Sequence, residues 1–132
     1  MLPYDDNLNN HIDMGKQIKN ILNGTSLVEM FSVALSKLED NFEAVNSLNV
    51  FPVPDGDTGT NMVLTLKHVV EVAENNKVKS AGESAKILSK AALNGARGNS
   101  GVILYSFIKG FSLGIAESNE LDDSLFVKSL EQ

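Results

Sequence analysis

The segment NVFPVPDGDTGTNM, residues 49–62, separates two stretches with helical patterns of apolar residues and decides how the chain folds. Pro52 and Pro54 lack a backbone N–H and favour extended geometry in the residues before them. Gly56 and Gly59 allow positive φ angles. The segment cannot continue a helix, so we expect a loop that ends where a new helix begins.

Apolar residues at spacings of three and four predict helices on both sides of this loop. The helix before it is expected to have its N-cap at Thr25 and to end before Asn49. Its apolar stripe consists of Leu27, Phe31, Ala34, Leu35, Leu38, Phe42 and Val45. The helix after it is expected from Thr60 to about Asn75, with a buried face formed by Met62, Leu66, Val69, Val70 and Ala73.

The second half of the chain predicts three further helices. Ser80 and Glu83 match a capping box that opens the first of them, which ends at a glycine-rich break over residues 95–101. The next, residues 102–117, is apolar nearly all round, which indicates a central position. Its glycines Gly110 and Gly114 would let another helix approach closely, and the last helix is capped by Asp122 or Asp123.

These patterns predict an all-α fold, an antiparallel helical barrel or bundle. We divide the chain into an N-terminal leader, residues 1–20, disordered in part or forming a short helix over residues 13–22, and a helical domain, residues 21–132. The chain has no cysteine and no apolar run long enough to span a bilayer, so we expect a cytoplasmic protein without membrane insertion. A net charge of −6 argues against nucleic-acid binding.

The first loop carries residues suited to a metal and an anion. Asp55 and Asp57 are one glycine apart, so both carboxylates can converge on one Mg²⁺. The helix start that follows, residues 58–61, offers N–H groups and a positive dipole end to a phosphate. The alternative is a simple turn followed by an N-cap. An EF-hand is rejected because its twelfth position would be Leu66.

The second loop, residues 95–101, has the composition of a backbone clamp around a ligand. It lacks the Gly-Lys-Ser/Thr of a Walker A loop, and a helix rather than a strand precedes it. The N–H groups of residues 98–101 form a candidate binding site for an anion or for the edge of a nucleotide base. The alternative is that this loop is only a tight turn between helices. Arg97, the only arginine, either binds phosphate or closes the preceding helix as a cation. For His68 a surface or half-buried structural role is favoured over catalysis.

Together the two loops resemble a known family. The stretch LNVFPVPDGDTGTNM (residues 48–62) followed by NGARGNSGVIL (residues 94–104) resembles the N-terminal nucleotide-binding domain of bacterial fatty acid kinases, which is similar to the ATP-binding subunit of dihydroxyacetone kinases. The resemblance implies a helical barrel that binds ATP or ADP and two Mg²⁺ ions at one end. It implies that Asp55 and Asp57 are metal ligands. The implied nucleotide contacts are Thr58, Gly59, Thr60, Asn61, Met62, Gly98, Asn99, Ser100 and Gly101.

Two departures from the family pattern qualify this resemblance. Dihydroxyacetone kinases have a third aspartate before the pair and a histidine after it, whereas here Asn49 stands near the first position and Thr58 replaces the second. This favours the fatty acid kinase branch and makes Asn49 the candidate third metal ligand. The related domain also contains further helices, so we expect the barrel to be shortened at its C-terminal side.

The resemblance also implies partners. In the fatty acid kinase branch the γ-phosphoryl passes to a fatty acid carboxylate held by a separate carrier protein, and further kinase domains complete the enzyme. We expect the isolated chain to be inactive, and apolar surface on the helix over residues 102–117 to favour a homodimer. The alternatives are the ATP-binding subunit of a dihydroxyacetone-type kinase and a regulatory nucleotide-binding fragment without turnover.

Overall fold

The computed structural model describes residues 21–48 and 56–132, and within these ranges the predicted all-α fold is confirmed. The five helices are α2 (Gly24–Ser47), α3 (Thr58–Asn75), α4 (Ala81–Gly95), α5 (Gly98–Ile115) and α6 (Asp123–Leu130). Among the described residues the only β-type pairing is one isolated antiparallel bridge between Leu22 and Leu121. The helix predicted over residues 13–22 lies almost wholly outside the described residues. Its predicted end at Leu22 is wrong, because Leu22 lies in this bridge.

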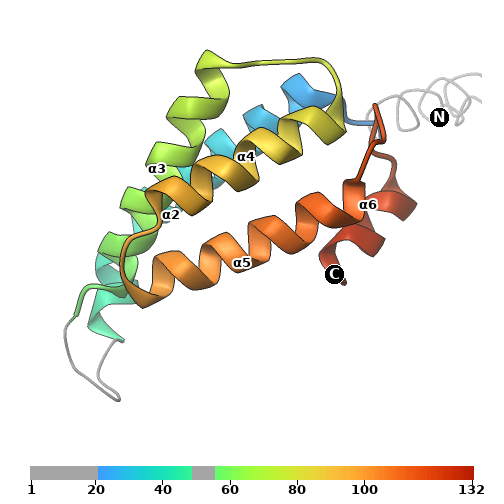
Figure 1. Cartoon of the computed structure of the whole chain (residues 1–132). Coiled ribbons are helices and arrows are strands. Elements are labelled where there is room, and N and C mark those ends of the chain that lie inside the picture. The colour runs from blue at the N-terminus through green and yellow to red at the C-terminus, as the bar shows by residue number, and fades with distance from the viewer. Residues whose placement is uncertain (1–20, 49–55) are drawn as a thin grey trace, which may run out of the picture.

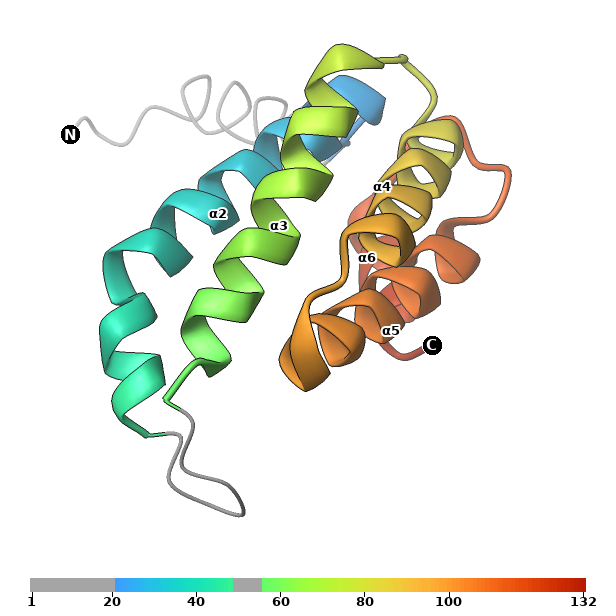
Figure 2. The same ribbon diagram turned by 60° about the vertical axis from the view of Figure 1, so that its left-hand side comes forward.

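The helices form a bundle in which neighbours along the chain run antiparallel (Figures 1 and 2). Helix α3 packs against α2, α4 and α5, and α6 packs against α5. As a result, α3 and α5 both begin at one end of the bundle, which we call the α3/α5 end. Helices α2, α4 and α6 begin at the opposite end, the α2/α4/α6 end (Figure 1).

The core lies where these helices cross. Helix α4 contributes a buried face made mostly of alanines, and their short side chains let neighbouring helices approach closely. Phe111 of α5 joins the flanking helices, because its ring centroid lies 6.4 Å from that of Phe31 in α2 and 5.7 Å from that of Phe126 in α6. The remaining core residues are Leu27, Val28, Leu66, Val69, Val70, Ala73, Ala81, Ala85, Leu88, Ala91, Ala92, Ile108, Ile115 and Leu121.

The helix predicted over residues 102–117 corresponds to α5, and its predicted central position is wrong. Helix α5 exposes Ile103 and Leu113 to 70% and 65%, because its described neighbours α3, α4 and α6 cover only part of its circumference. The predicted role is confirmed for Gly114, because a Cβ there would lie 2.5 Å from the Cα of Ser129 in α6. Gly110 faces Gln132, which lies beyond the end of α6. Within the described residues no helix is both long and apolar enough to cross a membrane.

Helix boundaries differ from the predicted ones by a few residues. The N-cap of α2 is Asn23 and not Thr25, because the Asn23 side chain accepts a hydrogen bond from the Ser26 N–H at 2.9 Å. Helix α3 begins at Thr58 rather than Thr60. The glycine-rich break is shorter than predicted, since α5 already begins at Gly98. In both α3 and α5 the extra helical residues are ones that the sequence assigned to the candidate loops.

The N-termini at the α2/α4/α6 end are capped by their own side chains. Asn23 caps α2, Ser80 accepts from the Glu83 N–H at 3.3 Å, and Asp122 accepts from the Leu125 N–H at 2.8 Å. Each bond satisfies one of the N–H groups that the first turn of a helix leaves without an internal partner. The Ser80 bond confirms the predicted cap of α4, and of the two predicted caps of α6 it is Asp122 that serves.

Candidate functional site

Helix α3 begins with an aspartate that does not cap it. Gly56 has a φ of +65°, a turn conformation that glycine adopts easily, and Asp57 follows as the N-cap residue of α3. The Asp57 carbonyl accepts the first helical hydrogen bond, from the Asn61 N–H at 2.9 Å, but its side chain makes no capping bond. The predicted metal ligands Asp55 and Asn49 lie outside the described residues.

A side chain from α2 holds the first turn of α3. The Asn46 Oδ1 accepts from the Thr60 backbone N–H at 3.0 Å, and its Nδ2 donates to the Thr60 Oγ1 at 2.9 Å. Beside this pair a Cβ at Gly59 would lie 2.3 Å from the Phe42 carbonyl oxygen, so only glycine permits this close approach of the two helices. The first turn of α3 is therefore fixed against the last turns of α2.

Helix α5 begins in a similar way, at a residue that does not cap it. Its N-cap is Arg97, whose side chain makes no capping bond. The Arg97 backbone N–H donates to the Oγ1 of Thr65, a fully buried residue of α3, at 3.0 Å. Gly98 has a φ of +66°, and a Cβ at Gly101 would lie 2.5 Å from the Thr65 Oγ1. Arg97 lies beyond the end of α4, so it is not a cation within the last turn of that helix.

These two helix starts meet. The Ser100 Oγ donates to the Thr58 carbonyl oxygen at 3.0 Å, which joins the first turns of α5 and α3. A Cβ at Gly98 would lie 2.4 Å from the Asn61 Nδ2, so the Asn61 amide rests against the α5 start. Of the other predicted contacts, Met62 is half-buried on α3 and Asn99 is exposed on α5.

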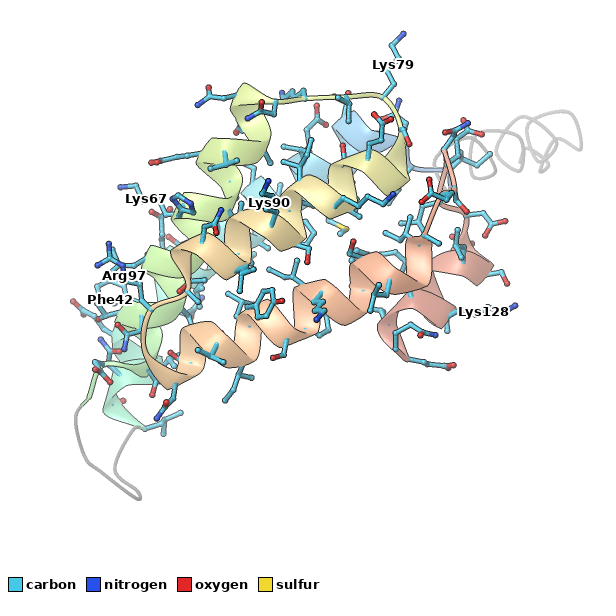
Figure 3. All side chains as sticks on the ribbon, in the orientation of Figure 1. Phe42, Lys67, Lys79, Lys90, Arg97 and Lys128 are labelled. Carbon is cyan, nitrogen blue, oxygen red and sulfur yellow. The ribbon has the colours of Figure 1, made fainter. Side chains whose placement is uncertain are left out.

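The electrostatics of this end favour an anion. The positive ends of two helix dipoles lie at this end, and the Ser100–Thr58 hydrogen bond joins the first turns of the two helices. The side chain of Arg97 is exposed at the same end, whereas Lys79 and Lys128 lie toward the opposite one (Figure 3). Two dipole ends and one guanidinium can attract a phosphate despite the acidic net charge.

Asp57 is the described residue among the predicted metal ligands at this end. Within residues 21–48 and 56–132 no three acidic, histidine or cysteine side chains gather. Asp57 is exposed at the start of α3, and a carboxylate offers the hard oxygen atoms that Mg²⁺ prefers. Mg²⁺ commonly takes one or two protein carboxylates and completes its shell with waters and phosphate oxygens. The residue that is present therefore fits Mg²⁺ held jointly with a phosphate.

Two hollows flank the first turns of α3 and share Leu64 in their walls. One, of about 210 Å³, is lined by Glu39, Phe42, Thr60, Val63 and Leu64. The other, of about 220 Å³, is lined by Leu64, His68, Asn94, Gly95, Ala96 and Arg97. His68 is half-buried, one of the two positions that the sequence favoured, and its structural role stays a prediction. A further hollow of about 250 Å³ between α2, α5 and α6 has an apolar lining and offers nothing to a phosphate.

Two residues that hold this end together, Asn46 and Thr65, were not predicted from the sequence. Both are polar residues on helix faces that are otherwise apolar: Asn46 lies one turn after Phe42 in α2, and Thr65 lies next to Leu66 in α3. A polar side chain on an apolar stripe needs a hydrogen-bond partner, and this signal could have singled out both residues before the structure was known.

Comparison with known proteins gives one family. Residues 52–132, which include most of the first loop and all of the second, match the DAK2 domain. The chain is 46% identical over 110 residues to an uncharacterized protein of Staphylococcus aureus strain USA300, and equally to those of strains NCTC 8325 and MRSA252. Each alignment covers 83% of this chain but 20% of the relative, so the chain spans about one fifth of the length of these curated relatives.

Proposed function

Because this chain belongs to the DAK2 domain family, the ATP-binding domain of kinases of the dihydroxyacetone kinase type, we propose that its α3/α5 end binds a magnesium nucleotide for phosphoryl transfer. One observation carries the proposal: the hydrogen bond from the Ser100 Oγ to the Thr58 carbonyl oxygen, which holds two helix N-termini side by side. Residues from two distant loops thus form one seat for a polyphosphate.

Each part of the seat has a role in this proposal. The N–H groups of Gly98, Asn99 and Ser100 in α5 and of Thr58 and Gly59 in α3 would bind phosphate oxygens. The N–H groups of Thr60, Asn61 and Gly101 already donate to Asn46, Asp57 and Arg97. Arg97 adds a positive charge at the rim. The two hollows beside Leu64 are candidate seats for the rest of the nucleotide.

Asp57 would hold Mg²⁺, together with Asp55 and the weaker candidate Asn49 in the part of the first loop outside the described residues. Bound Mg²⁺, two ions by resemblance, neutralises charge on the β- and γ-phosphates. The chain itself positions the nucleotide. Its helix dipoles and backbone N–H groups are fixed before the ligand arrives, so little reorganisation is needed when charge develops on the transferred group.

The phosphoryl acceptor lies outside this chain in the proposal. We infer that it is a fatty acid carboxylate presented by a separate carrier protein and that further domains of a longer kinase complete the reaction. Thr58 at the position where dihydroxyacetone kinases carry histidine supports this branch. The apolar surface of α5 is available to such domains or to a second copy of the chain.

Calorimetry tests the nucleotide site. The chain is expected to bind ATP with Mg²⁺ and to lose most of that binding with EDTA. Replacing both Asp55 and Asp57 by alanine should weaken binding at least about tenfold, because the carboxylates that share the cation are gone. Asp123→Ala, an exposed acid in the first turn of α6, is the matched control and should bind as the wild type does. Binding that is unaffected by EDTA would contradict the proposal.

The DAK2 match also favours a second candidate, the ATP-binding subunit of a dihydroxyacetone-type kinase. The two candidates differ only in the acceptor. Phosphoryl transfer from ATP, assayed with the complete kinase, distinguishes them. Product with carrier-bound fatty acid supports the first candidate, and product with dihydroxyacetone supports the second. Nucleotide binding without transfer to either acceptor indicates a regulatory domain.

A further inference from the structure

A groove with basic side chains runs between α3 and α4. It consists of two hollows, of about 300 and 220 Å³, which share His68 and Asn94 in their walls and are therefore continuous. Along α3 it extends from Leu64 to Asn76, a length of about 18 Å at the rise of an α-helix. We call it the α3/α4 groove, and its other lining residues are Val72, Ile87, Lys90, Ala91, Gly95, Ala96 and Arg97.

The charged side chains of this groove have one sign. Lys90 and Arg97 are exposed cations in its walls, whereas none of the described residues that line it is acidic. The hollow on the other side of α3 differs, because it has Glu39 in its wall. The whole chain differs too, since its net charge is −6. The positive charge of the groove is thus a local feature that the composition does not explain.

The basic residues of the groove form no ion pair with any other described residue. The ion pairs in that part of the chain join Lys77 to Glu74 and Lys86 to Glu117, and all four residues lie outside the groove lining. In Figure 3 the side chain of Lys90 extends from α4 on the side that faces α3. The groove therefore offers positive charge that the described fold leaves without an ion pair.

The dipoles of the neighbouring helices do not reverse this charge. Helix α4 ends at Gly95, and its C-terminal end carries a partial negative charge. Helix α5 begins at Gly98, and its N-terminal end carries a partial positive charge. Because these two ends are separated only by Ala96 and Arg97, their contributions offset one another and the charged side chains decide the sign.

The shape of the groove favours a polypeptide segment over a single small anion. Its length of about 18 Å corresponds to about five residues of extended chain. Its floor is apolar, because Val72 and Ile87 are half-buried and Ala91 is buried. Carboxylates pair with lysine and arginine, while the apolar parts of a peptide can cover such a floor. A nucleic acid is disfavoured by the net charge of −6.

We propose that the α3/α4 groove binds an acidic segment of a partner polypeptide. Arg97 lies both in the groove and at the rim of the proposed nucleotide seat, so a bound segment would bring its protein to the α3/α5 end. Only this purpose rests on the proposed function, because binding of the segment needs no nucleotide. The rest of the nucleotide would then take the other hollow beside Leu64, next to Phe42.

Binding of a fluorescent hexaglutamate peptide, followed by anisotropy without nucleotide, tests the proposal. The wild type is expected to bind the peptide and to lose affinity as sodium chloride is raised, because salt screens exposed charges. Lys90→Glu should weaken binding about fivefold or more, since it replaces a favourable charge pair by a repulsive one. A peptide of the same length made of glycine and serine should show no binding in the same concentration range.

Lys109→Glu is the matched control. Lys109 is an exposed lysine of α5 outside the groove lining, and its reversal changes the net charge as much as Lys90→Glu does. It should change the affinity for hexaglutamate by less than about twofold, because distant exposed charges are screened. Asn94→Asp places a carboxylate where the two hollows meet without removing a lysine, and it should weaken binding about threefold.

The outcomes separate this inference from the proposed function. A wild type that does not bind hexaglutamate, or equal losses in Lys90→Glu and Lys109→Glu, would overturn the inference. Phosphate that displaces the peptide more strongly than sodium chloride of equal ionic strength would indicate a site for a single anion and would also overturn it. Absence of ATP binding in calorimetry would overturn the proposed function and leave the binding of an acidic segment standing.

Discussion

The two ends of the bundle differ in which residues supply hydrogen-bond acceptors to the first-turn N–H groups of their helices. At the α2/α4/α6 end each helix satisfies a first-turn N–H with the side chain of its own N-cap residue, namely Asn23, Ser80 or Asp122. At the α3/α5 end the N-cap residues Asp57 and Arg97 make no such bond. There, side chains of Asn46 in α2 and Thr65 in α3 accept the hydrogen bonds from the backbone at the two helix starts.

This difference shows that neighbouring elements can stabilise a helix start in place of its own N-cap side chain. A self-capped helix start satisfies one of its first-turn N–H groups with its own side chain. At the α3/α5 end the stabilising bonds come from Asn46 of α2 and Thr65 of α3, which lie to the side of the two helix starts. The helix starts are rigid, but their own cap side chains are not committed to capping.

The largest expected loss of stability at the α3/α5 end follows Gly98→Ala. Gly98 has a φ of +66°, and a Cβ there would lie 2.4 Å from the Asn61 Nδ2, so alanine meets both backbone strain and a clash. We expect unfolding free energy to fall by about 2 kcal/mol or more, measured by urea denaturation, with weaker ATP binding. Gly110→Ala, in the same helix near the C-terminal Gln132, should be neutral or stabilising by up to about 1 kcal/mol. Equal losses of unfolding free energy for both variants would contradict the prediction that the positive φ and the Asn61 contact make Gly98 the more sensitive position.

An intermediate effect is expected from Thr65→Val. This change keeps the shape of a fully buried side chain but removes the acceptor of the Arg97 N–H and brings a larger methyl group toward Gly101. The expected cost is about 1.5 kcal/mol in thermal or urea unfolding. Ser129→Ala removes another buried hydroxyl, whose bond goes to the Leu125 carbonyl of its own helix, and should cost much less. A Thr65→Val variant as stable as the wild type would mean that the α5 start does not depend on α3.

The smallest effect concerns the opposite end. Asp122→Ala removes the cap of α6 and should lower the unfolding free energy by about 1 kcal/mol. Because α6 begins far from the candidate site, ATP binding at saturating Mg²⁺ should be unchanged in calorimetry. The neighbouring Asp123→Ala, which removes a charge but no cap, should cost less than Asp122→Ala. A loss of ATP binding in Asp122→Ala would show that the two ends are not independent.

The sequence predicted most of the fold because the local signals agree with the tertiary structure. Apolar periodicity located helices α2, α3, α4 and α5 within a few residues. Capping residues located the start of α4 at Ser80 and the start of α6 at Asp122. The exposed face of α5 could not be predicted in this way. An apolar helix indicates burial, but only the packed structure reveals which neighbours are there to cover it.

The candidate site was predictable in composition but not in geometry. The two glycine-containing loops were recognised from their residues, while the hydrogen bond from Ser100 to Thr58 joins residues far apart in sequence and depends on how α3 and α5 pack. The same holds for Asn46, whose partner Thr60 lies across the loop. Side-chain bonds between helices follow from packing, so periodicity alone does not reveal them. The predicted metal ligands Asp55, Asp57 and Asn49 stay predictions.

The backbone connections at the α2/α4/α6 end bear on the order in which the chain folds. Leu22 and Leu121 exchange two hydrogen bonds, of 2.9 and 2.8 Å, between segments near both limits of the described chain, and the Ala81 N–H donates to the Asn119 carbonyl beside them. Closing so long a loop is entropically costly until the intervening helices are in place. The antiparallel pairs α2–α3 and α4–α5 are therefore expected to form first, and this seam to close after the rate-limiting barrier. A weakened seam would then mainly accelerate unfolding and leave the refolding rate nearly unchanged.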